Sequence, residues 1–282
     1  MKVLLHLGFP KTGSSNLQFV VWKPLHERGV INLKTWRFED PSEHLNKRPS
    51  SRLFNYKKIL PDYLNFDDKK LNVLSDESFT APKRLRRNNF GSKIEDPKNF
   101  PQKIKDQILS KYPKANIEVL IILRNHKDLI FSQYVEEYNL KKYKNIELVF
   151  ESDEKTIDLD GFDIYQFNKY IDIISQTYGD KNVTVLFFEQ LKANPDYFFH
   201  SLSRLSNTSN EFVSEAFKKN RLNSKMKNKI GYMTKDGETL IPYFNSKQKN
   251  DIVDYFYQDT KLLIERFENS INLSKLGYNL YA

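Results

Sequence analysis

The sequence predicts an α/β fold, a three-layer sandwich in which a central parallel sheet lies between two layers of helices. Two observations support this prediction. An apolar strand pattern at residues 3–5 leads through a glycine-bounded loop into a helical pattern. A near-continuous apolar run at residues 117–123 is typical of a central parallel strand that is buried on both faces.

The strand, loop and helix at the N-terminus form a candidate anion site. Gly8 and Gly13 bound the loop, and apolar residues recur about one helical turn apart across residues 17–25. Backbone N–H groups in such a loop point inward, the helix dipole adds partial positive charge, and Lys11 supplies a full charge. The predicted cradle consists of Pro10, Lys11, Thr12, Gly13, Ser14 and Ser15.

The spacing within this loop differs from that of a nucleoside triphosphate site. Gly8 and Gly13 fit the pattern G-x-x-x-x-G-K-[ST], but Ser14 stands where that pattern requires lysine. A triphosphate site without this lysine loses a main counter-charge to the β- and γ-phosphates. The loop therefore favours a 5′-phosphate that carries something other than a polyphosphate tail.

A second group of residues suited to phosphate follows the strand at 117–123. Arg124 comes directly after the strand, and a guanidinium can bind a phosphate through two parallel hydrogen bonds. Ser132, about two helical turns further on, can present a hydroxyl to the same phosphate. Ligands of open α/β sheets bind outside the carboxyl ends of the strands, where both motifs are expected to lie.

These two segments together resemble the sulfotransferases that use 3′-phosphoadenosine-5′-phosphosulfate (PAPS). Residues 10–15 are similar to the family's 5′-phosphosulfate loop, P-K-[TS]-G-[TS]-[TS], and residues 124–134 to its 3′-phosphate motif, R-N-P-x-D-x-x-x-S-x-Y. His126 departs from the motif because it replaces the proline. The resemblance implies a P-loop-NTPase-like sulfotransferase fold, PAPS as donor, its 3′,5′-bisphosphate (PAP) as product and no metal. It assigns donor binding to the loop residues 10–15, Arg124 and Ser132.

Two weaker similarities extend the resemblance to about residue 192. Residues 74–78 resemble the S-x-E-S segment that follows a strand in carbohydrate and bacterial sulfotransferases, and residues 183–192 resemble a later V-x-x-x-x-Y-E-D-L-K strand. Sulfuryl transfer to a hydroxyl requires a general base. The resemblance implies Glu77 as this base and Lys11 as the group that neutralises charge on the leaving phosphate. His44 is the reserve base, whereas His6 is expected in the core.

Helical patterns predict the remaining architecture. They cover residues 104–112 and 164–178, a segment from Asn194-Pro195 to Leu205, and a long C-terminal helix at 252–267. We find no linker or repeat in the 282 residues, so we expect a single domain, with a helical part from about residue 195.

The net charge and the composition limit the classes of molecule that the protein is expected to bind. The net charge is +9, and Lys83, Arg84, Arg86 and Arg87 predict a basic flap near residues 80–100 that attracts an acidic acceptor or the donor's phosphates. We see no nucleic-acid-binding signature, and no cysteine is present. No apolar run approaches a membrane span, and the N-terminal apolar stretch is too short for a signal peptide, so we expect a cytoplasmic protein.

The sequence therefore predicts transfer of a sulfuryl group from PAPS to a hydroxyl acceptor, with a glycan or glycolipid favoured by Glu77 and the basic flap. Two alternatives remain. One is a divergent P-loop nucleotide kinase, which Ser14 opposes. The other is a non-catalytic module that binds nucleotide or glycan through the same cradle.

Overall fold

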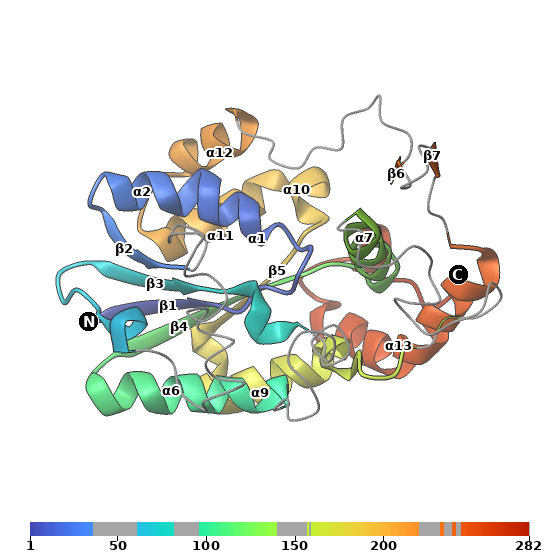
Figure 1. The fold of residues 1–282 in the computed structure, drawn as a ribbon, viewed down its shortest axis with the longest axis horizontal. Coiled ribbons are helices and arrows are strands. Elements are labelled where there is room, and N and C mark those ends of the chain that lie inside the picture. The colour runs from blue at the N-terminus through green and yellow to red at the C-terminus, as the bar shows by residue number, and fades with distance from the viewer. Residues whose placement is uncertain are drawn as a thin grey trace. The chain divides into compact units, whose positions relative to one another are not determined.

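A computed structural model describes residues 1–35, 61–81, 96–139, 157, 159–219, 232–233, 239–240 and 244–281 (Figure 1). His44 and the basic cluster at 83–87 lie outside these described residues. The chain divides into two compact units. The first contains residues 1–123 and 169–221, and the second contains residues 124–168 and 222–282.

A five-stranded parallel sheet forms the centre of the first unit. Its strands are β1 (Lys2–His6), β2 (Ile31–Lys34), β3 (Leu71–Ser75), β4 (Asn116–Leu123) and β5 (Val183–Phe187). Their order across the sheet is β2-β3-β1-β4-β5, and every neighbouring pair is parallel. The central strand predicted at residues 117–123 is therefore confirmed as β4, between β1 and β5.

The strand order reverses at β1. The chain moves from β1 to the edge strand β2, returns through β3, and then crosses to β4 on the other side of β1. In sheets of this kind, ligands bind outside the carboxyl ends of the strands at the reversal. The loop that follows His6 at the end of β1 therefore starts at the position where a ligand is expected.

Helices cover both faces of this sheet (Figure 1). One face carries α1 (Ser14–Asn16), the π-helical η1 (Leu17–Trp22), α2 (Lys23–Glu27), α10 (Gln190–Ala193), α11 (Pro195–Ser206) and α12 (Asn210–Lys219). The opposite face carries α6 (Phe100–Lys111) and α9 (Phe167–Tyr178). The predicted three-layer α/β arrangement is thus present in the first unit.

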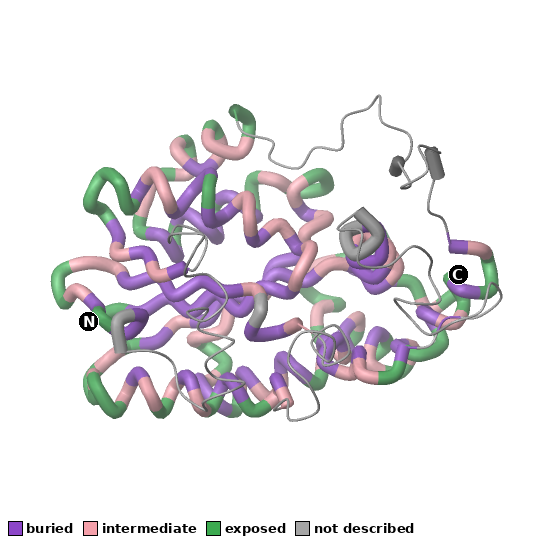
Figure 2. Tube along the Cα trace, in the orientation of Figure 1, coloured by how far each residue is buried: buried purple, intermediate pink, exposed green. Residues whose placement is uncertain are grey.

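Side chains that point alternately to the two faces of the sheet build the core between these layers. Successive strand residues point to opposite faces, and Leu4, Leu120 and Ile122 belong to one buried apolar cluster with Trp22 and Phe198. The strands are accordingly buried along most of their length (Figure 2). Each large side chain buried here contributes about 1.5–3 kcal/mol. We call the loop bounded by Gly8 and Gly13 the anion loop. This packing holds the helical residues that follow it against the sheet.

Helix ends follow local sequence signals. Asn194 Oδ1 accepts a hydrogen bond of 3.4 Å from the Tyr197 N–H, and Pro195 occupies the first turn of α11, as predicted. The predicted C-terminal helix is α13 (Ser246–Phe267), which begins with a capping box between Asn245 and Gln248. The patterns at 104–112 and 164–178 correspond to α6 and α9.

The second unit is built around α13 and α7 (His126–Asn139), which pack against each other. It also contains η7 (Asp163–Tyr165), η9 (Ser274–Leu276) and the antiparallel pair β6 (Tyr232–Met233) and β7 (Thr239–Leu240). The first unit has further short helices, η4 (Pro61–Leu64), η5 (Glu77–Thr80), η6 (Pro97–Asn99) and η8 (Asp180–Asn182). Among the helices described, none combines the length and apolar character that crossing a bilayer requires.

Candidate active site

Two residues of the anion loop, which Gly8 and Gly13 bound, have a left-handed backbone. Lys11 and Gly13 both have positive φ angles, of 68° and 89°. Between them, the Thr12 hydroxyl donates a hydrogen bond of 2.6 Å to the Phe9 carbonyl oxygen, which also accepts the Thr12 N–H at 3.3 Å. Left-handed residues in a tight loop create the concave amide arrangement that binds anions. The two left-handed residues are compatible with the predicted cradle, which stays a prediction.

Gly13 is required by its surroundings as well as by its φ angle. A Cβ atom at this position would lie 3.0 Å from Cε2 of Phe188, the residue after β5. The Phe188 N–H in turn donates a hydrogen bond of 2.7 Å to the carbonyl oxygen of Leu123, the last residue of β4. The loop after β1 is thus packed against the end of β5.

The helical stretch after the loop begins at Ser14. The Leu17 N–H donates to the Gly13 carbonyl oxygen at 3.2 Å, which closes the first turn. Ser14 is buried and Ser15 is half-buried. The Ser14 hydroxyl has no hydrogen-bond partner among the residues that the structure describes. A buried hydroxyl without a partner in an anion loop is available to a ligand.

Glu77 lies just beyond β3. The strand ends at Ser75, Asp76 is fully buried, and the half-buried Glu77 begins η5. The Thr80 hydroxyl, at the end of η5, shares its proton between the Gly8 carbonyl oxygen at 3.0 Å and the Glu77 carbonyl oxygen at 3.1 Å. The short helix that starts with Glu77 is therefore joined directly to the first glycine of the anion loop.

In the second unit, two residues of the predicted 3′-phosphate motif cap helix α7. The Asn125 side chain accepts the Asp128 N–H at 3.0 Å and donates to Asp128 Oδ2 at 2.9 Å. The Asn125 carbonyl oxygen also accepts the Leu129 N–H at 2.9 Å. These bonds fix the start of the helix. Arg124, half-buried, directly precedes the cap, and Ser132 lies half-buried on the same helix.

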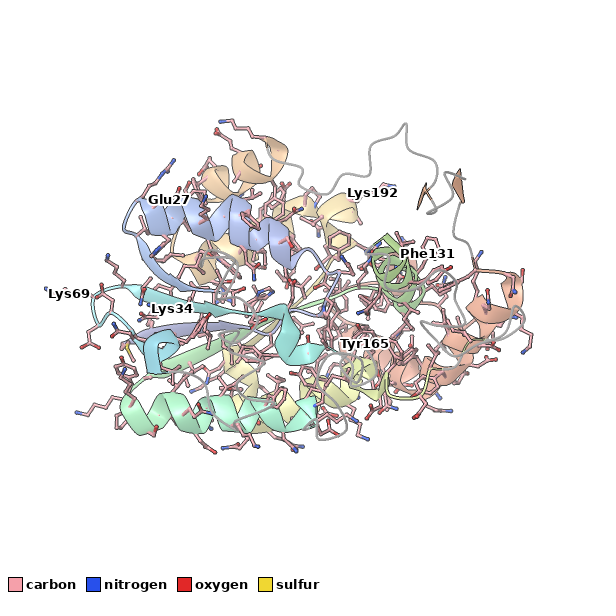
Figure 3. The ribbon with its side chains drawn as sticks, viewed as in Figure 1. Glu27, Lys34, Lys69, Phe131, Tyr165 and Lys192 are labelled. Carbon is pink, nitrogen blue, oxygen red and sulfur yellow. The ribbon has the colours of Figure 1, made fainter. Side chains whose placement is uncertain are left out.

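His126 occupies the motif's proline position and is held rigidly. Its ring stacks between Phe167 and Phe256, with centroid distances of 4.3 and 4.1 Å. His126 Nε2 lies 2.8 Å from the Tyr165 carbonyl oxygen, and burial lowers the pKa of His126 to about 4. Tyr165, labelled in Figure 3, also donates its hydroxyl proton to Gln133 on α7. Stacking and hydrogen bonding thus restrain a turn that proline would restrain covalently.

The family can now be assigned. The family model of the sulfotransferase domain matches residues 2–269, nearly the whole chain. The chain belongs to this family. The predicted resemblance is therefore confirmed.

Solved structures of other sulfotransferases are similar to this chain. A sulfotransferase from Alicyclobacillus acidocaldarius has a TM-score of 0.50 at 14% identity, with 96% of this chain and 97% of that chain covered. Mouse sulfotransferase SULT7A1, solved in complex with PAP, has a TM-score of 0.45 at 16% identity, with 98% and 88% covered. The first of these likenesses, together with the parallel sheet, confirms the sulfotransferase fold.

One further relative is not named as a sulfotransferase. Guanylate cyclase beta of Plasmodium berghei (strain Anka) is 29% identical to this chain over 243 residues. The match covers 80% of this chain but only 7% of that protein. This chain therefore corresponds to a small part of the relative.

Two residues that contact the anion loop were not predicted from the sequence. Phe188 limits the space at Gly13, and Thr80 anchors Gly8. The similarity at residues 183–192 gave a signal for Phe188, which aligns with the tyrosine of that pattern. No pattern pointed to Thr80, because its partner lies 72 positions away. Neither His44 nor the basic flap cluster can be placed, since both lie outside the described residues.

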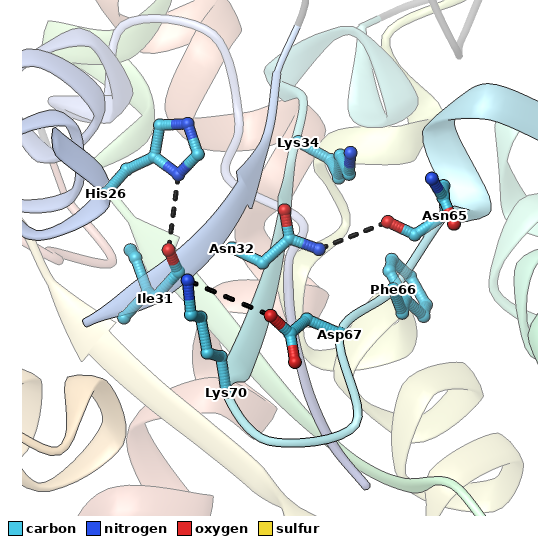
Figure 4. Close-up of a pocket in the computed structure, with 8 residues that line it drawn as sticks. All are labelled: His26, Ile31, Asn32, Lys34, Asn65, Phe66, Asp67 and Lys70. Atoms are coloured by element: carbon cyan, nitrogen blue, oxygen red, sulfur yellow. Dashed lines mark hydrogen bonds and ion pairs between the residues drawn. The ribbon is translucent and has the colours of Figure 1, made fainter. Parts of the chain in front are cut away.

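A separate hollow of about 370 Å³ lies beside the edge strand β2 (Figure 4). Its lining includes Asn32, which donates to the Asn65 carbonyl oxygen at 3.1 Å, and Lys70, whose Nζ lies 3.8 Å from Asp67 Oδ2. None of the predicted donor-binding or catalytic residues lines it. Lys70 and Asp67 pair with each other, and the hollow is not part of the predicted site.

Proposed function

We propose that this chain transfers a sulfuryl group from PAPS to a hydroxyl group of an acceptor, and that the acceptor is a glycan or glycolipid. The observation that carries the proposal is the left-handed anion loop in a chain of the sulfotransferase family. A cytoplasmic location remains a prediction from the sequence alone.

The loop residues fit the 5′-phosphosulfate end of the donor. The backbone from Pro10 to Ser15 supplies N–H groups, Lys11 supplies a positive charge, and Ser14 supplies a buried hydroxyl that has no partner in the described part of the chain. Arg124 and Ser132 are proposed to bind the 3′-phosphate. Asn125 and Asp128 support this role, because their capping bonds fix the helix that carries Ser132.

PAPS, when bound, supplies the sulfuryl group, which moves in line to the acceptor oxygen in analogy with phosphoryl transfer. Lys11 and the loop N–H groups are proposed to neutralise the negative charge that grows on the leaving phosphate. Glu77 is proposed to remove the proton of the acceptor hydroxyl. Its place at the start of η5, joined through Thr80 to Gly8, supports this role because it ties the base to the loop.

The acceptor class rests on Glu77 and on the basic cluster at 83–87. A carboxylate base is what the resemblance to carbohydrate-type sulfotransferases implies, and a basic cluster attracts acidic acceptors. The proposal therefore favours hydroxyl groups of glycans, especially those that already carry negative charge.

A transfer assay tests the proposed function. The protein is incubated with PAPS carrying radioactive sulfur and a panel of neutral glycans, acidic glycans, glycolipids and phenols. We expect labelled glycan or glycolipid and an equal amount of PAP, and a loss of roughly 10²–10³ in rate for Lys11→Ala. Labelled phenols alone would contradict the acceptor class. Binding of PAP without transfer to any acceptor would contradict enzymatic function, and phosphoryl transfer from ATP would favour a nucleotide kinase.

A further inference from the structure

A buried polar cluster adjoins Gly8 of the anion loop, and the proposed chemistry uses only one of its members, Ser14. Its members are His6, Gln18 and Ser75, all fully buried, and Ser14, which is 2% exposed. They come from β1, β3 and the helical stretch after the loop. Polar side chains in such a position are costly to bury unless each finds a hydrogen-bond partner.

Three atoms of this cluster lack a partner among the described residues: Gln18 Oε1, His6 Nε2 and Ser14 Oγ. His6 Nε2 and Ser14 Oγ border the same small space at Gly8, because a Cβ atom added to Gly8 would lie 2.4 Å from His6 Nε2 and 2.6 Å from Ser14 Oγ. A side chain at position 8 would therefore separate the two groups, and glycine leaves them adjacent.

The remaining contacts favour one of the two neutral forms of His6. Ser75 Oγ accepts a hydrogen bond of 2.9 Å from Gln18 Nε2. Its own proton can be donated to His6 Nδ1, which lies 2.9 Å away. Burial lowers the pKa of His6 to about 3, so the ring is neutral, and donation from Ser75 to Nδ1 places its single proton on Nε2. Trp22 packs edge-on against the ring at 5.0 Å and restricts its rotation.

We propose that His6 is a positioning residue for the donor: when the 5′-phosphosulfate binds in the loop, His6 Nε2–H comes to donate to Ser14 Oγ, a bond that these two neighbouring atoms do not make in the structure, and this directs the Ser14 hydroxyl proton toward the 5′-phosphosulfate. Gln18, Ser75, His6 and Ser14 then form one chain in which each group donates to the next. Without this bond, the Ser14 proton can turn back toward the ring and leave an oxygen lone pair facing the anion. The inference rests on the proposed function, because it requires a donor phosphate in this loop.

Two substitutions separate this role from simple packing. In His6→Asn the amide ends where Nδ1 lies, so the contact with Ser75 can persist while the donor at Nε2 is lost. In His6→Gln the longer side chain carries an amide N–H to the place of Nε2. We expect His6→Asn to weaken PAP binding about 5- to 10-fold, as for one neutral hydrogen bond. We expect His6→Gln to restore most of that affinity.

The readout is titration calorimetry with PAP and with adenosine 3′-phosphate, which lacks the 5′-phosphate. The loss in His6→Asn should appear with PAP only. In combination with Ser14→Ala it should add nothing, because His6 acts through Ser14. An equal loss with both nucleotides, or additive losses, would overturn the inference while leaving the proposed function intact. A wild-type protein that binds neither nucleotide would overturn both.

The tautomer of His6 can be measured on the unmodified protein. This measurement tests the proposed role of His6 even if the variants do not fold. In ¹⁵N-labelled protein, long-range correlation spectra distinguish an Nε2–H ring from an Nδ1–H ring. We expect His6 as the neutral Nε2–H form, with its Nε2–H resonance shifted when PAP is added. An Nδ1–H ring, or a resonance unchanged by saturating PAP, would overturn the inference.

Discussion

The hydroxyl of Thr80 donates a hydrogen bond of 3.0 Å to the carbonyl oxygen of Gly8. This bond joins η5, which starts with the proposed base Glu77, to the first residue of the anion loop, 72 positions earlier in the chain. Two parts of the site that come from different strands are therefore held to each other directly. An error of about 1 Å between reacting groups can reduce a rate about 10²-fold, so such a bond matters for catalysis.

Thr80→Val tests this coupling. The variant keeps the side chain's shape but leaves the Gly8 carbonyl oxygen without this donor. We expect the free energy of unfolding to fall by about 1–3 kcal/mol and the turnover number to fall about tenfold or more. Thr177→Val is the matched control, because Thr177 donates a similar bond of 2.7 Å to the Ile173 carbonyl oxygen within α9. If both variants keep full turnover, the bond does not position the base.

Gly13→Ala tests the shape of the loop. Alanine at φ 89° is strained by about 1–2 kcal/mol, and its Cβ atom would also lie 3.0 Å from the Phe188 ring. Gly179→Ala is the control, since Gly179 has a similar φ of 85° but its nearest neighbour would lie 3.7 Å away. We expect both variants to lose stability in chemical denaturation, whereas only Gly13→Ala should lose PAP affinity. Normal PAP binding by Gly13→Ala would mean that the loop does not hold the 5′-phosphate.

Glu77→Gln tests the proposed base. The substitution keeps the side chain's size and removes its basicity, so we expect turnover to fall by roughly 10²–10⁴ with unchanged PAP binding. Asp67→Asn, a carboxylate beside the hollow at β2, serves as the control. Near-normal turnover in Glu77→Gln together with an inactive His44→Ala would assign the base to His44. The preference for a glycan acceptor would then lose its main support.

His126 predicts a pH dependence of stability. Burial lowers the pKa of His126 from 6.5 to about 4, so between these values the unfolded chain binds a proton that the folded protein does not. The free energy of unfolding should therefore fall as the pH falls through this window, by up to about 1.4 kcal/mol per pH unit for this residue. His126→Phe retains a ring between Phe167 and Phe256 and should reduce the slope by one proton. Equal slopes for both proteins in denaturant titrations from pH 4 to 8 would show that His126 titrates normally.

Local sequence signals predicted much of the fold. The apolar run at 117–123 predicted β4, and Asn194-Pro195 predicted the start of α11, because these signals depend on neighbouring residues. The loop at residues 8–13 was recognised by its glycines and lysine. The contacts of His6 could not be predicted, because its partner Ser75 lies 69 positions away on another strand. The surroundings of His126 could not be predicted either, because the aromatic rings that stack on it come from distant segments of the chain.

Calorimetric titration of PAP against adenosine 5′-phosphate and ATP decides whether the chain has a PAPS site. PAP should bind tightest, because Arg124 and Ser132 are proposed to contact a 3′-phosphate that the other two nucleotides lack. Arg124→Ala should weaken PAP binding tens-fold or more, given about 1.5–3 kcal/mol for each charge-assisted contact, and should leave the affinity for adenosine 5′-phosphate unchanged. Equal affinities for PAP and adenosine 5′-phosphate, or tighter binding of ATP, would contradict the proposed donor.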